Sequence, residues 1–142
     1  MSFEVTGIDI WAGEIEDRPG ALNEKLGQLA SGGANLEFAI VRPSADSPGH
    51  GVLFVAPLEG AAQMELAVQL GLHKSERIHA ARVSGPDRPG LLADLSRILA
   101  ESKINICGLS AAAVGDRCVF YFRFETVAAA RQAADVFRSA LA

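Results

Sequence analysis

The sequence predicts an α+β fold built from two similar halves, each an antiparallel sheet with helices on one face. Three observations predict it. The tetrapeptide Asp17-Arg18-Pro19-Gly20 recurs unchanged as Asp87-Arg88-Pro89-Gly90. In both halves, segments with the alternating hydrophobicity of strands are interleaved with segments of helical periodicity. Finally, Gly115-Asp116 lies between two such strand segments and predicts a tight hairpin, whose strands must be antiparallel.

The repeat extends beyond the tetrapeptide. At the constant offset that relates Asp17 to Asp87, eight of the twenty positions from 17 to 36 are identical, among them Leu22, Leu29, Ala30 and Asn35. A continued register of this kind indicates a duplication. We therefore assign residues 1–75 to a first unit and residues 76–142 to a second.

The first half contains three clear strands and two helices. Residues 8–15 alternate and predict a strand. Apolar positions spaced i, i+4, i+7 and i+8 after Gly20 predict a helix that ends at two glycines. Further strands are predicted over 35–42 and 51–57, a helix over 60–70 with Gly71 as its cap, and a short fourth strand over 72–78.

The second half repeats this order but lacks a fourth strand. Strands are predicted over 78–84, 105–114 and 117–124, and helices over 90–102 and 126–141. The pattern βαββα(β), twice, is that of two ferredoxin-like units in tandem. An uncovered sheet edge is an aggregation hazard. The segment from Met1 to Val5, set apart by Gly7, is predicted to fill that edge of the second sheet or to pair with another subunit.

The hairpin register predicts which side chains share a face. The helix-facing side should carry Cys107, Leu109, Ala111, Cys118, Phe120, Phe122 and Phe124. The other side should carry Ile106, Gly108, Ser110, Val119, Tyr121 and Arg123. At the offset of the repeat, that second face holds Leu36, Phe38 and Ile40, which should not be bare to water. We expect it to make sheet-to-sheet or subunit contacts, with a homodimer as the simplest assembly. Trp11 and Phe3 are expected to pack on the first sheet.

Composition excludes several classes of function. The net charge of −4 and pI near 5.3 do not favour binding to nucleic acid or to an anionic membrane. No signal sequence or spanning segment is evident, and two cysteines form no disulfide framework, so we expect a cytoplasmic protein with reduced thiols. His50, His73 and His79 do not have metal-ligand spacing, and nucleotide-binding motifs are absent. No cofactor is expected.

Each half resembles an ACT domain, the small regulatory amino-acid-binding module of many enzymes of amino-acid metabolism. The residues that carry the resemblance are Asp17-Arg18-Pro19-Gly20-Ala21-Leu22 and Asp87-Arg88-Pro89-Gly90-Leu91-Leu92. Each motif is followed by an Asn that is predicted to open the second strand, in Asn35-Leu36 and Asn105-Ile106. The layout is similar to that of free-standing tandem ACT proteins such as the regulators of the glycine cleavage system.

The resemblance implies two ligand sites. One would use Asp17, Gly20, Ala21, Leu22, Asn35 and Leu36, and the other Asp87, Gly90, Leu91, Leu92, Asn105 and Ile106. Helix N-terminal amides suit a carboxylate, and the Asp carboxylates and Asn amides suit an ammonium group. Some amino-acid-binding members have an amide in place of Asp17 and Asp87 and a His two residues earlier, where this chain has Ile15 and Gly85. These departures leave the ligand's identity open.

The same residues also have purely structural interpretations. An Asp before a helix is also a plain N-cap, and Arg18 and Arg88 are expected to be solvated or paired at the surface. The sequence therefore predicts a regulatory protein that binds an amino acid or similar small metabolite without catalysis. The alternative is a ligand-free interaction module that dimerises through its sheet faces and docks an unidentified protein partner. No convergent acid, base and nucleophile points to an enzyme.

Overall fold

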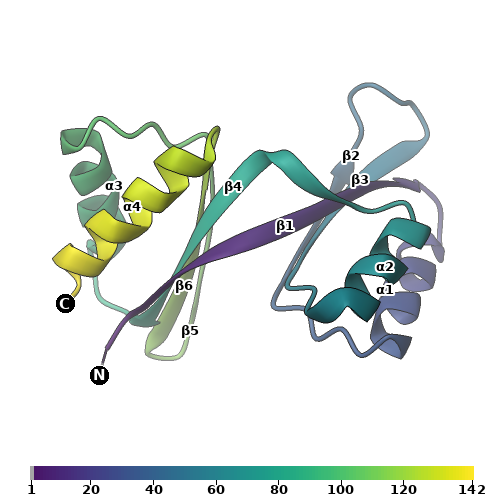
Figure 1. Cartoon of the computed structure of the whole chain (residues 1–142), viewed down its shortest axis with the longest axis horizontal. Coiled ribbons are helices and arrows are strands. Elements are labelled where there is room, and N and C mark those ends of the chain that lie inside the picture. Colours follow the sequence, from purple (N-terminus) through teal and green to yellow (C-terminus); the bar gives the residue numbers. More distant parts are fainter. Residues whose placement is uncertain (1) are drawn as a thin grey trace. The chain divides into compact units, whose positions relative to one another are not determined.

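The structure, a computed structural model, describes residues 2–142 apart from the side chain of Arg77. Contacts divide the chain into two compact units (Figure 1). The N-terminal unit is Asp9–Ser75. The C-terminal unit combines residues 2–8 with Glu76–Ala142. Residues 2–8, which the sequence division places in the first unit, therefore pack with the second. Within the described part of the chain, no helix is long and apolar enough to cross a membrane.

The N-terminal unit has the ferredoxin-like arrangement predicted for it. Its elements are β1 (Glu4–Glu16) from Asp9 onward, α1 (Ala21–Ser31), β2 (Phe38–Pro43), β3 (His50–Ala56), α2 (Gly60–Gln69) and the start of β4 (His73–Pro86). The strands lie in the order β2-β3-β1-β4. Both helices contribute to one core with the sheet, formed by Trp11, Ile15, Leu29, Leu53, Val55, Leu58, Ala67 and Leu72. Trp11 thus packs on this sheet as expected.

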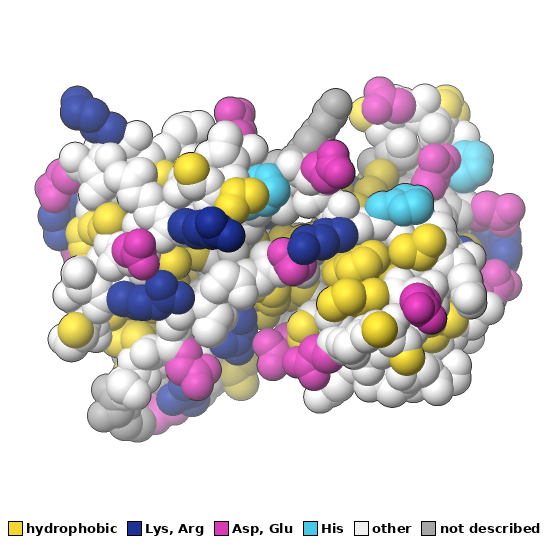
Figure 2. Space-filling view, viewed as in Figure 1, with side chains coloured by type: hydrophobic (Ala, Val, Ile, Leu, Met, Phe, Trp, Pro, Cys, Tyr) yellow, Lys and Arg dark blue, Asp and Glu magenta, His cyan; other side chains and the backbone are white. Residues whose placement is uncertain are grey.

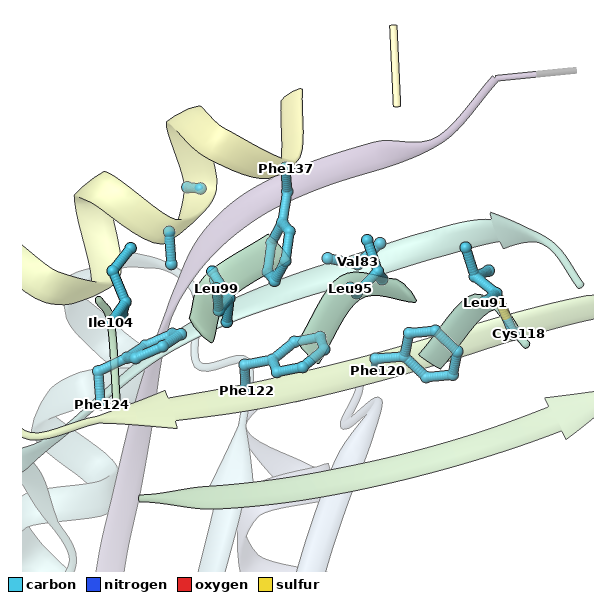
Figure 3. Close-up of a cluster of buried hydrophobic side chains, with 13 residues drawn as sticks. Val83, Leu91, Leu95, Leu99, Ile104, Cys118, Phe120, Phe122, Phe124 and Phe137 are labelled. Carbon is cyan, nitrogen blue, oxygen red and sulfur yellow. The ribbon is translucent and has the colours of Figure 1, made fainter. Parts of the chain in front are cut away.

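The C-terminal unit has the same arrangement, with strand order β1-β4-β6-β5. Its remaining elements are α3 (Leu91–Glu101), β5 (Gly108–Val114), β6 (Arg117–Phe124) and α4 (Val127–Ala140). Figure 3 shows the core, where Leu91, Leu95 and Leu99 from α3 and Phe137 from α4 meet the Phe120, Phe122 and Phe124 rings of β6. The Phe122 and Phe137 ring centroids are 4.9 Å apart.

The start of β1 supplies the strand that the second half lacks. Phe3 and Val5 pack against the core of the C-terminal unit. The carbonyl oxygen of Val5 accepts hydrogen bonds from Arg138 Nε and Nη2 at 3.3 and 3.0 Å. The prediction that this segment fills an edge of the second sheet is confirmed for Glu4 and Val5, while Met1 lies outside the described residues. Phe3, however, packs on the second unit and not on the first sheet.

Two predicted breaks in the strands were wrong. Gly7 does not interrupt β1, and the segments predicted at 72–78 and 78–84 form the single strand β4. Both long strands pass from one unit to the other along the sequence, so a side-chain pattern that changes core halfway is mistaken for two elements. A glycine inside a strand weakens it but does not by itself end it.

The strands β2 and β5 begin three residues later than predicted, at Phe38 and Gly108. Asn35 and Asn105 therefore lie in the connecting loops. Because the strand alternation has not yet begun there, Leu36 and Ile106 pack against the helix-covered cores. Their prediction on the opposite face was wrong. Phe38 does lie on that face and is buried, as expected.

The hairpin register is as predicted, with Val114 opposite Arg117 and Ala113 opposite Cys118. Cys118 and the three phenylalanines of β6 are buried, but Cys107, Leu109 and Ala111 are exposed. The reason is that β5 is the edge strand of its sheet. Two helices suffice to cover the inner strands and leave the outermost strand open on the same face.

The packing of Phe3 on Gly85 is testable by a double-mutant cycle. A Cβ atom at Gly85 would lie 2.8 Å from Phe3 Cε1. We expect Gly85→Ala to lower the free energy of unfolding by about 1–3 kcal/mol through overpacking. In a Phe3→Ala background, the same substitution should cost much less. Urea denaturation of the four proteins measures this, and additive costs would contradict the contact.

A second prediction concerns the ends of α1 and α3. Gly33 follows α1 with a φ of 87°, and Lys103 takes the equivalent place after α3 with a φ of 59°. This conformation costs an L-residue about 1–2 kcal/mol. We expect Lys103→Gly to relieve this strain and so stabilise the protein. The gain should be about 1 kcal/mol or less, because glycine loses more backbone entropy on folding and this offsets part of the relief. Gly33→Ala is the matched control and should destabilise it in urea denaturation.

Candidate functional site

The two repeated turns have the same backbone geometry. After β1 and β4, the chain turns through Asp-Arg-Pro-Gly, and Gly20 and Gly90 adopt φ values of 88° and 81° directly before α1 and α3. These values lie in the region that favours glycine. The Ala21 and Leu91 N–H groups each donate to the Arg carbonyl at 3.3 Å. The glycines are thus required for the sharp entry into each helix.

No side chain caps either helix among the described residues. The alternative role of Asp17 and Asp87 as N-caps is therefore not seen. Both carboxylates are exposed, and they form no hydrogen bond or ion pair with the described part of the chain. Their backbone N–H groups donate to the carbonyls of Gly49 and Asp116 at 3.0 and 2.8 Å. Each Asp is fixed by its backbone while its carboxylate faces solvent beside a helix N-terminus, which favours anions.

The two arginines are paired at the surface, as expected. Arg18 Nη2 lies 3.0 Å from Glu24 Oε2, and Arg88 Nη2 lies 2.9 Å from Asp94 Oδ2. Arg18 also forms an ion pair with Glu16. The hydrogen bond from Arg18, and then its charge, lower the pKa of the Glu16 carboxyl. Each arginine thus links its turn to the first part of the following helix through an ion pair with an acidic side chain of that helix.

A hollow of about 370 Å³ lies beside the first turn. Ile15 and Ala21 line it together with three acidic and three basic side chains: Glu14, Glu16, Glu24, Arg18, Lys25 and His50. His50 Nδ1 is 3.6 Å from Glu14 Oε1, and Lys25 Nζ donates to the Leu70 carbonyl at 2.7 Å. Mixed charges of this kind match a zwitterion. Of the residues predicted for the first site, Ala21 alone lines this hollow.

The structure does not bring each turn together with its Asn within one unit. Glu16, at the end of β1, pairs with His50, whereas Phe38, after the Asn35 loop, pairs with Ala56 at the other end of β3. The helix α1, of 11 residues, spans about 16 Å between them. Gly20, Ala21 and Leu22 thus lie near Asp17, and Asn35 and Leu36 lie at the opposite end of the sheet.

The C-terminal unit repeats this separation. Asp87, Gly90, Leu91 and Leu92 form the turn, and α3 carries the chain away from it to Asn105 and Ile106. Ala21 and Leu91 are buried, so their side chains serve the cores and only their backbone faces the turn.

The buried thiol of Cys118 is not suited to act as a nucleophile. Burial raises the pKa of the Cys118 thiol, whose Sγ lies 3.6 Å from the Gly85 carbonyl oxygen. A thiol in this state is a weak nucleophile. No group of His, Cys, Asp and Glu side chains within the described residues is suited to hold a metal ion.

The C-terminal unit matches a model of a known protein family. Residues 79–137 match the model of the ACT domain. The C-terminal unit is therefore similar to an ACT domain over these residues. The match begins within β4 and ends in α4, so it spans the second repeated turn. No match was found among curated protein sequences.

Solved structures show the same fold over the whole chain. A crystal structure of a protein from Bacteroides thetaiotaomicron has a TM-score of 0.77 at 16% identity and covers 96% of this chain and 90% of that chain. The ligand-free regulatory subunit of aspartate kinase from Thermus thermophilus has a TM-score of 0.65 at 16% identity, covering 100% and 98%. At these identities, the likeness concerns the ACT fold alone.

The sequence analysis missed the acidic partners of the arginines and the His50–Glu14 pair. The signal for the first was present, because Glu24 and Asp94 are related by the same offset as the two turns. A comparison of identical residues does not reveal it, since one acid is a glutamate and the other an aspartate. His50 follows a loop that has no counterpart in the second half, and nothing in the local sequence places it beside Glu14.

The Glu16–Arg18 pair gives a pH-dependent prediction. Because the folded-state pKa of Glu16 is lowered, the pair's contribution to stability is present above the unfolded-state pKa and lost as pH falls through the folded-state value. We expect Arg18→Gln to return the Glu16 pKa toward its ordinary value, measured by carbon-detected NMR titration of its carboxyl. Arg131→Gln, an exposed change on α4, is the control and should leave it unchanged.

Proposed function

We propose that this chain is a regulatory protein that binds an amino acid at the turns carrying Asp17 and Asp87, without catalysing a reaction. The observation that carries the proposal is the pair of ACT-type turns, each with an exposed, unpaired carboxylate next to a helix N-terminus. The carboxylate suits the ligand's ammonium group, and the first-turn amides suit its carboxylate.

The separation of turn and Asn loop refines the proposal. Because α1 keeps Asp17 and Asn35 apart, a ligand that contacts both must lie between the turn of one copy of the chain and the Asn loop of another. Such a ligand would stabilise one arrangement of a homodimer and so shift its population. The likeness in fold to a regulatory subunit of aspartate kinase supports a regulatory role.

Composition supports a protein of the cytoplasm that acts on small molecules. The net charge is −4. On the face shown in Figure 2, basic side chains are interspersed with acidic ones. A surface that binds nucleic acid or an anionic membrane would instead have its basic side chains clustered in one patch.

One observation favours the second candidate, a ligand-free interaction module. The edge strands β2 and β5 expose apolar side chains: Val41 is 43% exposed, Leu109 40% and Val114 80%. Apolar edges of this kind are suited to pairing with another chain. In that case, the protein would assemble with a protein partner irrespective of amino acids.

The test is a thermal-shift screen against the twenty amino acids at millimolar concentration. A ligand at 100 times its Kd stabilises the folded state by roughly 2.7 kcal/mol, which raises Tm by several degrees. We expect one chemically related group to do so, and Asp17→Ala with Asp87→Ala to abolish the shift. Silence across the panel, together with a stable dimer in light scattering, would favour the interaction module.

Asn35→Ala distinguishes the two geometries of the site. Loss of binding together with loss of ligand-dependent dimerisation is expected for a ligand held between two copies. Binding that persists unchanged in this variant, but is lost in Asp17→Ala, would place the ligand at the turn of a single unit.

A further inference from the structure

A second hollow, of about 270 Å³, lies in the C-terminal unit, and its lining contains none of the residues of the two turns. Val83 and Phe120 face the helix-covered core. Since strand residues alternate, Ser84, Val119 and Ala112, which are neighbours across β4, β6 and β5, face the opposite side. The hollow therefore lies on the helix-free face of the sheet. Its lining is Glu4, Arg82, Ser84, Ala112, Val114, Arg117, Cys118 and Val119.

The polar side of this hollow contains a buried hydroxyl. Ser84 is 7% exposed and is the buried polar residue of the described chain. Its Oγ accepts a hydrogen bond from Arg82 Nη1 at 3.1 Å. Arg82 is itself held by Tyr121 Oη at 3.4 Å and by the Glu4 carboxylate at 3.8 Å. The Ser84 hydroxyl proton has no acceptor among the described residues and is available to a ligand.

The charge and the floor of the hollow define the ligand class. Two guanidinium groups, those of Arg82 and Arg117, face one carboxylate, that of Glu4. Arg117 is exposed and forms no ion pair in the described part of the chain. Ala112, Val114 and Val119 provide an apolar floor, with Val114 80% exposed. One net positive charge beside apolar side chains matches a single carboxylate with a hydrocarbon chain.

We propose that this hollow binds a short aliphatic monocarboxylate. Its oxygens accept hydrogen bonds from Arg117 and from the Ser84 hydroxyl, and its chain lies on Val114 and Val119. Glu4 disfavours a second negative charge. This chemistry is shared by plain aliphatic acids and by aliphatic amino acids, whose ammonium group would lie near Glu4. The site shares no lining residue with the turns in the proposed function.

The site belongs to one unit only. At the offset that relates the two turns, Ala12 and Glu14 stand where the C-terminal unit has Arg82 and Ser84. The N-terminal unit therefore lacks both the guanidinium and the hydroxyl and bears an extra carboxylate. Its sheet is an internal control in any experiment on the whole chain.

The experiment is a titration of the isotope-labelled full chain with 3-methylbutanoate and, separately, with L-valine, followed by two-dimensional NMR. We expect amide shifts concentrated at residues 82–84 and 112–119. Arg117→Gln should weaken binding about tenfold or more, as loss of a charge-assisted hydrogen bond does. Val114→Asp, which places a carboxylate on the floor, should also abolish it. Both residues are exposed, so the variants are expected to fold, and Arg131→Gln should bind normally.

The outcomes separate this site from the turns. Shifts confined to residues 17–25 and 87–94 would support the proposed function and overturn the hollow. Unchanged affinity in Arg117→Gln, or the absence of shifts with both probes, would also overturn the hollow. Shifts at the hollow alone would support it whatever the turns bind. Glu4→Gln then identifies the source: weaker binding of L-valine alone indicates an amino acid, and unchanged binding of both probes indicates a plain acid.

Discussion

The edge of the C-terminal sheet needs a strand that residues 76–142 do not contain, and residues from the start of the chain provide it. A strand at the edge of a sheet that lacks a neighbour exposes a row of backbone hydrogen-bonding groups. It also leaves one side of the hydrophobic core under the sheet uncovered. Phe3 and Val5 close that core, Arg138 anchors the Val5 carbonyl, and Gly85 leaves room for the Phe3 ring. The packing of α3, α4 and β6 around this core depends on its being covered by Phe3 and Val5.

The second constraint acts at the turns into α1 and α3. Glycine in the left-handed conformation is the only residue that makes this entry without strain, and it leaves the first amides of the helix without a side-chain cap. The adjacent arginine is bound to an acid on the helix, so it does not neutralise the Asp next to it. Each turn thus keeps an exposed carboxylate next to a set of amide donors that no side chain caps.

The repeat and the local periodicities were enough to predict the helices, the hairpin register and the antiparallel order, because each depends on residues close in sequence. The long strands β1 and β4 were not recognised, since their side chains change from one core to another at Gly7 and near residue 76. The resemblance assigns Asn35 and Asp17 to one site. The spacing of the motif does not show that their loops lie at opposite ends of the sheet. His50 near Glu14 and the Ser84 hollow are products of cross-strand pairing, which no local pattern encodes.

The shared closing strand has a consequence for synthesis. Residues 2–8 are made before residues 76–142, which contain the elements that they pack against. At about 5–20 residues per second, translation of residues 76–142 takes roughly 3–13 s. During that interval, Asp9–Ser75 has all its own strands and helices, whereas Phe3 and Val5 have no core to enter. The nascent chain therefore carries an unpaired apolar segment, and a chaperone or a neighbouring nascent copy has this period in which to capture it.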